Sequence, residues 1–354
     1  MLISNMSTSK FLVTGGAGFI GSNFIHFLLE RYNDINIINF DNLTYAGNLN
    51  NLSTIEKDPR YTFIKGDITE IKKVKKVFDQ FLPDHVINFA AESHVDRSIL
   101  NPDIFVRSNV LGVQNLLQAS LKHGVTRFLQ ISTDEVYGSL GKTGKFYETT
   151  PLNPHSPYSA SKASADLLTQ AYFHTFNLPI NITRCSNNYG PYQFPEKLIP
   201  LTILNCLNGK KIPLYGDGLN VRDWIHVEDH CSAIDLVLHN GEPGDIYNVG
   251  AQYERSNIGI VKLIIQILAD LRPDLKVSED LIAFVEDRKG HDRRYAIDST
   301  KIQKELHWKP SIPFENGLKN TIRWYLDHSD WLDSIITKKY LEYYQMVNEN
   351  KFQV

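Results

Sequence analysis

The stretch "KFLVTGGAGFIG", Lys10–Gly21, runs from an apolar segment into a glycine-rich turn. Gly15, Gly18 and Gly21 are spaced G-x-x-G-x-x-G, and apolar residues then recur at helical spacing in "FIGSNFIHFLLERY". A strand, a glycine turn and a helix in this order let a pyrophosphate approach the backbone and the helix N-terminus. The stretch therefore predicts the first βαβ unit of a dinucleotide-binding domain.

Strand-like and helical patterns alternate through the first half of the chain, which is typical of right-handed βαβ crossovers. We therefore predict an α/β fold with a Rossmann-like, doubly wound parallel sheet. Strands are expected at 10–14, 35–41, 61–67, 84–91 and 127–132, and helices at 70–81, 101–122 and around 157–172.

The amino-acid composition changes after Tyr189, where "YGPYQFPEKLIP" is rich in proline and aromatic residues. We expect residues 1–189 to form an NAD-binding Rossmann domain, to which a later segment, about 224–250, returns. Residues 190–354 should form mainly a smaller, mixed α/β substrate lobe. The segment from Trp331 to Asn348 has no Pro or Gly and predicts an amphipathic helix.

Composition narrows the class of protein. The 354 residues carry a net charge of −3, which argues against nucleic acid as a partner. The three cysteines, Cys185, Cys206 and Cys231, have no zinc-like spacing and suggest reduced thiols, so we expect a cytoplasmic protein without a metal site. The chain shows no signal-peptide pattern and no apolar run of the roughly 20 residues that span a bilayer, so no membrane association is expected.

Asp41 lies at the end of the second predicted strand, after "INIINF". Its carboxylate could accept the adenosine ribose hydroxyls and would repel a 2′-phosphate. The following "DNLTYAGN" offers no Arg or Lys to bind such a phosphate. The predicted cofactor is therefore NAD rather than NADP. Asp67, after the third strand, suits the adenine edge or a plain turn equally well.

Tyr158 and Lys162 lie four positions apart in "YSASK", on one face of a predicted helix. A nearby ammonium lowers the pKa of a phenol, so the pair could take a proton from an alcohol while its carbon loses a hydride.

In "ISTDEVYG", Thr133, Asp134 and Glu135 follow the fifth strand, at the edge of the sheet where ligands bind. Two adjacent carboxyls in a cleft do not ionise together easily, which gives one acid and one base. The sequence does not say which is which.

Together, "TGGAGFIG" and "YSASK" resemble the extended short-chain dehydrogenase/reductases. The blocks "AAESHVDRS", "STDEVYG", "RCSNNYGPYQFPEKLIP", "YGDGLNVRDWIHVEDH" and "DRKGHDRRYAID" further resemble the nucleotide-sugar 4,6-dehydratases that act on dTDP-glucose. The resemblance covers about residues 11 to 298. It implies oxidation at C4 of the hexose, elimination of water across C5 and C6, and return of the hydride to C6, which leaves a 4-keto-6-deoxy sugar.

The resemblance assigns each catalytic residue a role. Tyr158 would take the C4 hydroxyl proton, Glu135 the C5 proton, and protonated Asp134 would donate to the departing C6 hydroxyl. Thr133 would hydrogen-bond the C4 oxygen, and Lys162 would hold the nicotinamide ribose. A homodimer formed through two helices of the dinucleotide domain is also implied. The alternatives are a dehydratase for UDP-glucose, a nucleotide-sugar 4-epimerase and a non-catalytic NAD-binding regulator.

The predicted binding residues fall into two sets. Ser108 stands where the family would have Thr, which keeps the hydroxyl. The cofactor set is Gly15, Gly18, Phe19, Ile20, Gly21, Asp41, Asn42, Leu43, Thr44, Asp67, Ile68, Phe89, Ala90, Ala91, Ser108, Tyr158, Lys162 and Asn188. The substrate set is Ser93, Thr133, Asn187, Lys197, Leu198, Pro213, Tyr215, Arg222, Asn257, His291, Asp292, Arg293, Arg294 and Tyr295.

Overall fold

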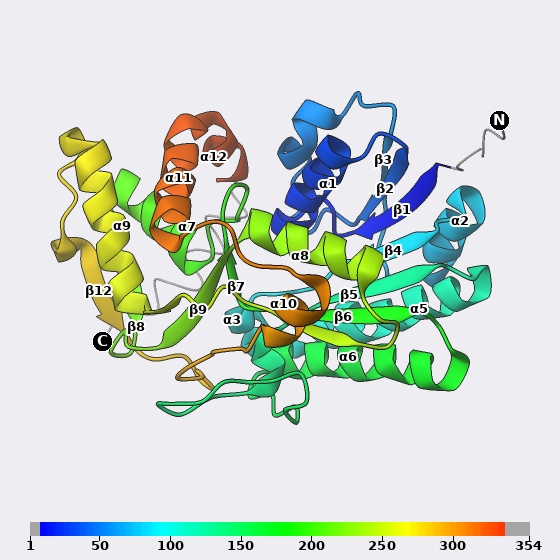
Figure 1. Ribbon diagram of the computed structural model, residues 1–354. Coiled ribbons are helices and arrows are strands. Elements are labelled where there is room, and N and C mark those ends of the chain that lie inside the picture. The colour runs from blue at the N-terminus through cyan, green and yellow to red at the C-terminus, as the bar shows by residue number, and fades with distance from the viewer. Residues whose placement is uncertain (1–7, 337–354) are drawn as a thin grey trace.

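A seven-stranded parallel sheet forms the centre of the computed structural model, which describes residues 8–336 (Figure 1). The strand order is β10-β6-β5-β4-β1-β2-β3, so the chain reverses its direction of growth at β1, between β2 and β4. This confirms the predicted Rossmann-like, doubly wound α/β class. The strands are β1 (Ser9–Thr14), β2 (Ile35–Asp41), β3 (Tyr61–Lys65), β4 (His85–Asn88), β5 (Arg127–Thr133), β6 (Ile180–Cys185) and β10 (Ile246–Val249).

Helices cover both faces of this sheet (Figure 1). Successive side chains of a strand point to opposite faces. In β1, Phe11 and Val13 belong to the core under α1 and α8, whereas Leu12 belongs to the core under α2, α5 and α6. The helices are α1 (Phe19–Arg31), α8 (Val227–Asn240), α2 (Ile71–Phe81), α5 (Gly112–His123) and α6 (Pro157–Phe176).

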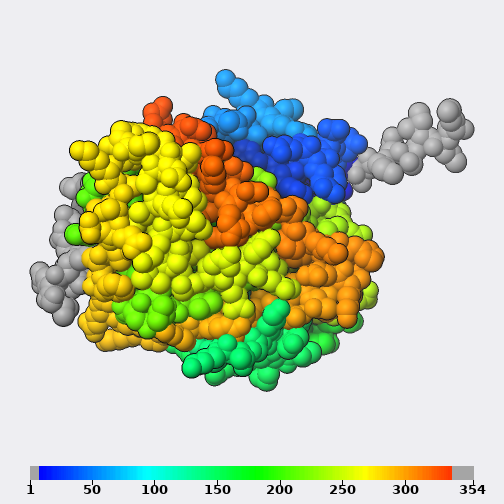
Figure 2. All heavy atoms as spheres, turned by 60° about the vertical axis from the view of Figure 1, so that its left-hand side comes forward, coloured from blue at the N-terminus to red at the C-terminus, as the bar shows by residue number. Residues whose placement is uncertain are grey.

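A second lobe with its own apolar core lies beside the sheet, on the left of Figure 1. Seen from that side, its residues form one broad surface (yellow to orange in Figure 2) next to the blue N-terminal segment. Its strands are β7 (Asn187–Tyr189), β8 (Ile212–Tyr215), β9 (Val221–His226), β11 (Glu254–Ser256) and β12 (Ile282–Val285). Its helices are α7 (Leu198–Leu207), α9 (Asn257–Leu271), α11 (Phe314–Asp327) and α12 (Ser329–Ile335).

The chain passes between the lobes more than once. After β9 it returns to the large sheet, where α8 covers one face and β10 pairs in parallel with β6. The short helices between these elements are α3 (Val95–Leu100), α4 (Pro102–Val106), α10 (Thr300–Leu306), and the 3-10 turns η1 (Leu49–Ile55), η3 (Asp134–Tyr137), η4 (Pro273–Leu275) and η5 (Glu279–Leu281).

The helix expected at 101–122 is interrupted. It consists of α4, a π-helical turn η2 (Arg107–Leu111) and α5. Within η2, the side chain of Asn109 accepts a hydrogen bond from Glu92 N–H and donates to Ser161 Oγ, at 2.9 and 2.8 Å. The wider turn thus serves tertiary contacts that a uniform helix pattern in the sequence does not reveal.

Two other expected elements differ at their ends. The strand expected at 84–91 ends at Asn88, because residues 89–91 leave the sheet to line a cavity. Of the helix expected from Trp331 to Asn348, α12 ends at Ile335, and the part beyond residue 336 lies outside the described residues. Within residues 8–336, none of the helices has the length and apolar character needed to cross a membrane.

Candidate active site

A cavity of about 460 Å³ opens between the carboxyl edge of the large sheet and the second lobe. Its walls are the turn after β1, the ends of β2 and β5, the start of α6, and β8 with the loop that follows β12. This is the edge of a doubly wound sheet at which ligands bind.

The glycine turn after β1 is tightly packed. Gly15 has φ +68°, and a Cβ at this position would lie 2.6 Å from Ala90 N. Helix α1 begins directly after Gly18, and no side chain caps its N-terminus. The first N–H groups of α1 and its partial positive charge are therefore available to an anion such as a pyrophosphate.

Asp41 ends β2 at the rim of the cavity. Its Oδ2 accepts a hydrogen bond from Ala17 N–H at 2.9 Å, and its Oδ1 accepts one from Leu43 N–H at 2.7 Å. Each carboxylate oxygen can accept a second bond, which leaves room for ribose hydroxyls. The glycine turn and this acid thus fit NAD. Leu43 does not itself line the cavity and contributes through this main-chain contact.

The capped start of α6 fixes Tyr158 and Lys162. Ser156 and Ser159 form a reciprocal capping box, with Pro157 as the first helical residue. Both Tyr158 and Lys162 line the cavity, and Lys162 Nζ donates to the Ile131 carbonyl at 2.6 Å.

One prediction about this pair is wrong. We expected the ammonium of Lys162 to lower the pKa of Tyr158. Burial, followed by the charge of Glu135, instead raises the pKa of Tyr158 well above its usual value. Burial also lowers the pKa of Lys162. The ammonium donates to the Ile131 carbonyl, and the Thr133 hydroxyl only partly offsets the rise in the pKa of Tyr158.

The two adjacent carboxyls lie in different surroundings. Asp134 is buried, and burial together with the charge of Glu135 raises its pKa well above the usual value. Burial also raises the pKa of Glu135, but three cations act against that rise, namely Arg288, Lys197 and Arg222. Asp134 is therefore the carboxyl that is more readily kept protonated and so able to donate, and Glu135 is the one that is more readily ionised and so able to accept.

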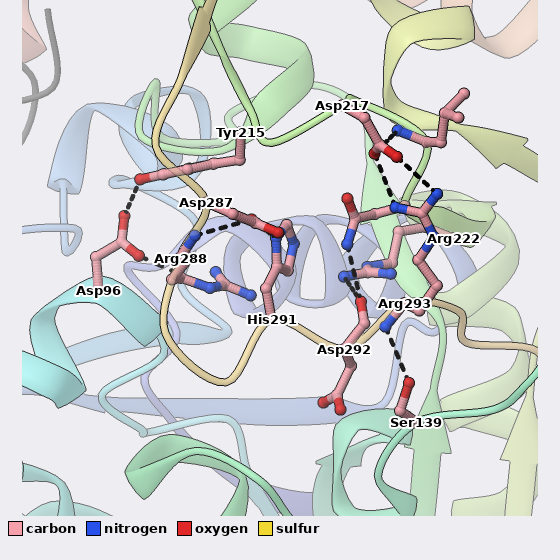
Figure 3. Close-up of polar contacts among 12 residues, drawn as sticks. Asp96, Ser139, Tyr215, Asp217, Arg222, Asp287, Arg288, His291, Asp292 and Arg293 are labelled. Atoms are coloured by element: carbon pink, nitrogen blue, oxygen red, sulfur yellow. Dashed lines mark hydrogen bonds and ion pairs between the residues drawn. The ribbon is translucent and has the colours of Figure 1, made fainter. Parts of the chain in front are cut away.

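The far end of the cavity is cationic (Figure 3). Arg288 and Arg222 both line it, and Arg222 Nη2 donates to the Asp292 carbonyl at 2.9 Å. Asp96, from α3, joins the lobes here. Its Oδ2 accepts a hydrogen bond from Tyr215 Oη at 2.6 Å, and its Oδ1 lies 3.8 Å from Arg288 Nε. Two guanidinium groups at one end suit a diphosphate.

Comparison with known proteins distinguishes between dehydration and epimerisation, the two reactions considered for this site. A family model described as GDP-mannose 4,6 dehydratase matches residues 12–321. The dTDP-glucose 4,6-dehydratase of Xanthomonas campestris pv. campestris (strain B100) is 51% identical over 343 residues, which cover 94% of this chain and 97% of that protein. The chain belongs to the dTDP-glucose 4,6-dehydratase family.

Solved structures agree with this family assignment. The dTDP-glucose 4,6-dehydratase from Bacillus anthracis, determined in complex with NAD, superposes with a TM-score of 0.85 at 50% identity, covering 92% of this chain and 99% of that one. A UDP-glucose 4-epimerase from Thermotoga maritima gives a TM-score of 0.81 at only 29% identity, covering 90% and 99%. The epimerase shares the fold, whereas the dehydratases share far more of the sequence.

Most of the residues expected from the resemblance lie together in the cavity of this dehydratase-family chain. Those that line it are Gly15, Gly18, Phe19, Ile20, Gly21, Asp41, Asn42, Thr44, Asp67, Ile68, Phe89, Ala90, Ala91, Ser93, Ser108, Thr133, Asp134, Glu135, Tyr158, Lys162, Asn187, Asn188, Lys197, Leu198, Pro213, Tyr215, Arg222, Asn257, His291 and Tyr295.

Three residues of the expected substrate set lie outside the cavity lining. The guanidinium of Arg293 pairs with Asp217, and that of Arg294 pairs with Glu254, each at 2.7 Å. The Asp292 carboxylate is hydrogen-bonded to His155 and Tyr295, and its main-chain carbonyl accepts a hydrogen bond from Arg222 (Figure 3). The carboxylates that hold these two arginines come from distant parts of the chain, so the sequence did not indicate them.

Arg288 is the main residue that the sequence analysis missed. It stands in the quoted block "DRKGHDRRYAID", but the predicted substrate set in this block begins at His291 and includes the double arginine instead. Gly290, two residues after Arg288, has φ +66° and marks a turn. This glycine is the local signal that could have indicated an inward-pointing Arg288. Glu196 was missed too; it lines the cavity, and burial raises its pKa to about 7.

Proposed function

We propose that this chain removes water from dTDP-glucose and forms the 4-keto-6-deoxy sugar nucleotide. One observation carries the proposal: a buried acid, Asp134, and a carboxylate next to three cations, Glu135, share one cavity with Tyr158. A 4-epimerase needs a tyrosine and a coenzyme, but it has no use for a C5 base and a C6 acid.

The cofactor of the proposed reaction is NAD. It would be held by the glycine turn, by the N-terminus of α1 and by Asp41, and Lys162 would contact its nicotinamide ribose. When bound, NAD supplies an acceptor for the C4 hydride that later returns it to C6, and its oxidised form carries a positive charge.

The residues of the chain then handle the protons. The positive charge of bound NAD would favour the phenolate of Tyr158, which then takes the proton of the C4 hydroxyl, and Thr133 hydrogen-bonds the C4 oxygen. The C4 ketone makes the C5 proton acidic, and Glu135 removes it. Asp134 donates its proton to the C6 hydroxyl, which leaves as water. The proton on Glu135 exchanges with solvent, and Glu135 then protonates C5 when the hydride reaches C6.

The cationic end would bind the diphosphate. Arg222 and Arg288 offer planar, charge-assisted donors, and Lys197 adds a third positive charge. The remaining cavity residues of the expected substrate set would surround the base and the sugar.

We also propose that the chain forms a homodimer in the cytosol. Large apolar side chains are exposed on neighbouring elements of the sheet domain, in α3, α4, η2 and α6. They are Leu100, Val106, Leu111 and Leu167. A cluster of this kind is typical of a protein interface. Free, buried thiols at all three cysteines are consistent with a reducing compartment.

We infer that the division of labour follows the two lobes. Residues 1–189 would bind NAD through the glycine turn, and the returning segment at about 224–250 would complete this domain with α8 and β10. The strands β7 and β9, at the borders of these ranges, pair with each other in the second lobe. The substrate lobe would then consist mainly of the residues after 190.

Incubation with dTDP-glucose in deuterated water tests the proposed reaction. We expect a product that has lost one water and carries deuterium at C5, measured by mass spectrometry and NMR. A product of unchanged mass with inverted C4 would indicate an epimerase. Turnover of UDP-glucose in preference to dTDP-glucose would contradict the proposed base specificity.

A further inference from the structure

Tyr45 joins the two lobes beside the end of the cavity that Asp41 borders. It lies in the loop after β2, and its Oη donates a hydrogen bond to Glu196 Oε1 at 3.0 Å. Glu196 lies just before α7 in the second lobe, and its side chain is only 3% exposed. The Arg97 guanidinium lies over the Tyr45 ring at 3.6 Å, and Phe194 packs edge-on against that ring, with the ring centroids 5.8 Å apart. A buried carboxyl thus connects the lobes through one phenol.

The two segments that this hydrogen bond joins both line the cavity. Four residues of the loop at 42–47 do so from the first lobe, and residues 193–197 do so from the second. The base of the loop is fixed within the first lobe, where Asn48 N–H donates to the Ala17 carbonyl of the glycine turn at 2.9 Å. Its tip is attached to the second lobe through Tyr45. Both segments therefore border the site proposed for NAD.

We propose that the hydrogen bond between Tyr45 and Glu196 retains NAD in the cavity between turnovers. Tyr45 is then a positioning residue, because it acts on the coenzyme through the loop that it anchors. This step rests on the function and the cofactor proposed above. Glu196 takes no part in the proton transfers of that reaction. Release of NAD requires the loop and residues 193–197 to separate, and this buried hydrogen bond must break for them to do so.

The protonation states of the two side chains suit this hydrogen bond. Burial and the charge of Glu196 raise the pKa of Tyr45 well above its usual value, so the phenol keeps its proton and donates. Burial raises the pKa of Glu196 to about 7, against the effects of the Lys197 charge and of the hydrogen bond from Tyr45. At about pH 8 the carboxyl is therefore mainly ionised, and the bond is charge-assisted.

The same segment reaches the substrate end of the cavity. Lys197, next to Glu196, donates to the Ser93 carbonyl at 2.9 Å and is one of the cations proposed for the diphosphate. An ammonium has three donors, which leaves others for phosphate oxygens. A nucleotide that holds Lys197 also keeps Glu196 in contact with Tyr45. We therefore expect bound nucleotide to tighten NAD binding, and by linkage NAD tightens the binding of the nucleotide by the same factor.

A simpler role for this hydrogen bond is to stabilise the packing of the lobes. That role predicts a lower melting temperature without any change in the release of NAD. Other contacts between the lobes lie nearby. Asn23 Nδ2 donates to the Pro191 carbonyl at 3.0 Å. Trp331 Nε1 donates to Asn51 Oδ1 at 2.8 Å. These contacts should hold the lobes together in a variant that lacks the Tyr45 hydroxyl.

The test compares Tyr45→Phe with Tyr32→Phe. Tyr45→Phe keeps the ring and removes the hydroxyl. Tyr32→Phe is the matched control, because Tyr32 Oη also donates to a carboxylate, Asp235 Oδ2 at 2.9 Å, outside the cavity. Each protein is loaded with the fluorescent analogue etheno-NAD, and its release is followed after excess NAD is added at about pH 8. Tyr45→Phe should release the analogue roughly ten-fold faster or more, as expected for a lost hydrogen bond to a charged group, and Tyr32→Phe at the unaltered rate.

Two further measurements link the effect to this one bond. Glu196→Ala should also accelerate release, and adding Tyr45→Phe to Glu196→Ala should cause little further change, because the two side chains act as a pair. Saturating dTDP, which carries the diphosphate without the sugar, should slow the release of etheno-NAD from the unaltered protein. This effect of dTDP should be weaker in Tyr45→Phe.

Equal release from Tyr45→Phe and Tyr32→Phe would overturn the proposal. Additive effects in the double variant, or an effect of dTDP that Tyr45→Phe leaves unchanged, would do the same. If Tyr45→Phe does not fold, unaltered release from Glu196→Ala or the absence of any effect of dTDP on the unaltered protein would overturn it instead. Failure of the unaltered protein to bind etheno-NAD, or to dehydrate dTDP-glucose, would overturn the proposed cofactor or the proposed function.

Discussion

Asp134 and Glu135 are adjacent in the chain, yet the fold gives them different proton affinities. The sequence predicted a pair that splits into an acid and a base, and only the resemblance assigned the roles. The deciding charges come from residues far along the chain, Lys197, Arg222 and Arg288, which act on Glu135. No local pattern around residue 134 could have supplied this information.

We predict that Glu135→Gln slows elimination by roughly two to four orders of magnitude, because the amide cannot accept the C5 proton. Oxidation at C4 by way of Tyr158 should persist, so NADH absorbance should appear on mixing with dTDP-glucose while product formation nearly stops. Glu148→Gln is a matched control, since Glu148 lies outside the cavity and accepts a hydrogen bond from Asn248 N–H. Loss of NADH formation together with dehydration would contradict the role of Glu135 as the C5 base.

At the scale of elements, the turn between β1 and α1 was predictable because its constraint is local. Glycine spacing, a preceding strand and a following helix all lie within "KFLVTGGAGFIG". The break at η2 was not predictable in the same way. Its residues follow a helical pattern, and the reason for the wider turn lies in Glu92 and Ser161, which Asn109 reaches across the fold.

We predict that Gly15→Ala strongly weakens NAD binding, because its Cβ would lie 2.6 Å from Ala90 N at a φ of +68°. Gly124→Ala is a matched control, since Gly124 has φ +61° with no atom within 4 Å of the added Cβ. The backbone cost of about 1–2 kcal/mol is then shared by both variants. Calorimetric titration with NAD should show weaker binding for Gly15→Ala alone, and equal affinities in the two variants would contradict the close packing of the turn.

At the scale of the whole molecule, the class of fold was predictable and the closure of the cavity was not. Alternating strands and helices indicate the doubly wound sheet before any contact is known. The cavity is completed by contacts between the lobes, such as Asp96 with Tyr215 and Arg288. Asp96 lies more than a hundred positions from both Tyr215 and Arg288. For this reason the sequence analysis missed Arg288 and named Arg293 and Arg294, whose guanidinium groups pair with Asp217 and Glu254.

We predict that Leu167→Glu converts the proposed dimer into monomers, because a charge replaces a leucine that is 57% exposed on α6. Light scattering after size-exclusion chromatography measures the mass. Phe284→Glu is the matched control, since Phe284 is 59% exposed on β12 in the other lobe. A Leu167→Glu protein that keeps the mass of the unaltered protein, or an unaltered protein that is monomeric, would contradict this interface.

The late return of β10 to the sheet has a consequence for biosynthesis and for engineering. During translation, β6 stays a bare, apolar edge until β7, α7, β8, β9 and α8 have left the ribosome. A fragment that stops at Tyr189 would keep that edge open and would tend to aggregate. A substrate lobe grafted onto a different nucleotide-binding scaffold would therefore have to be added in two pieces. These pieces flank the scaffold segment that corresponds to residues 227–249, which contains α8 and β10.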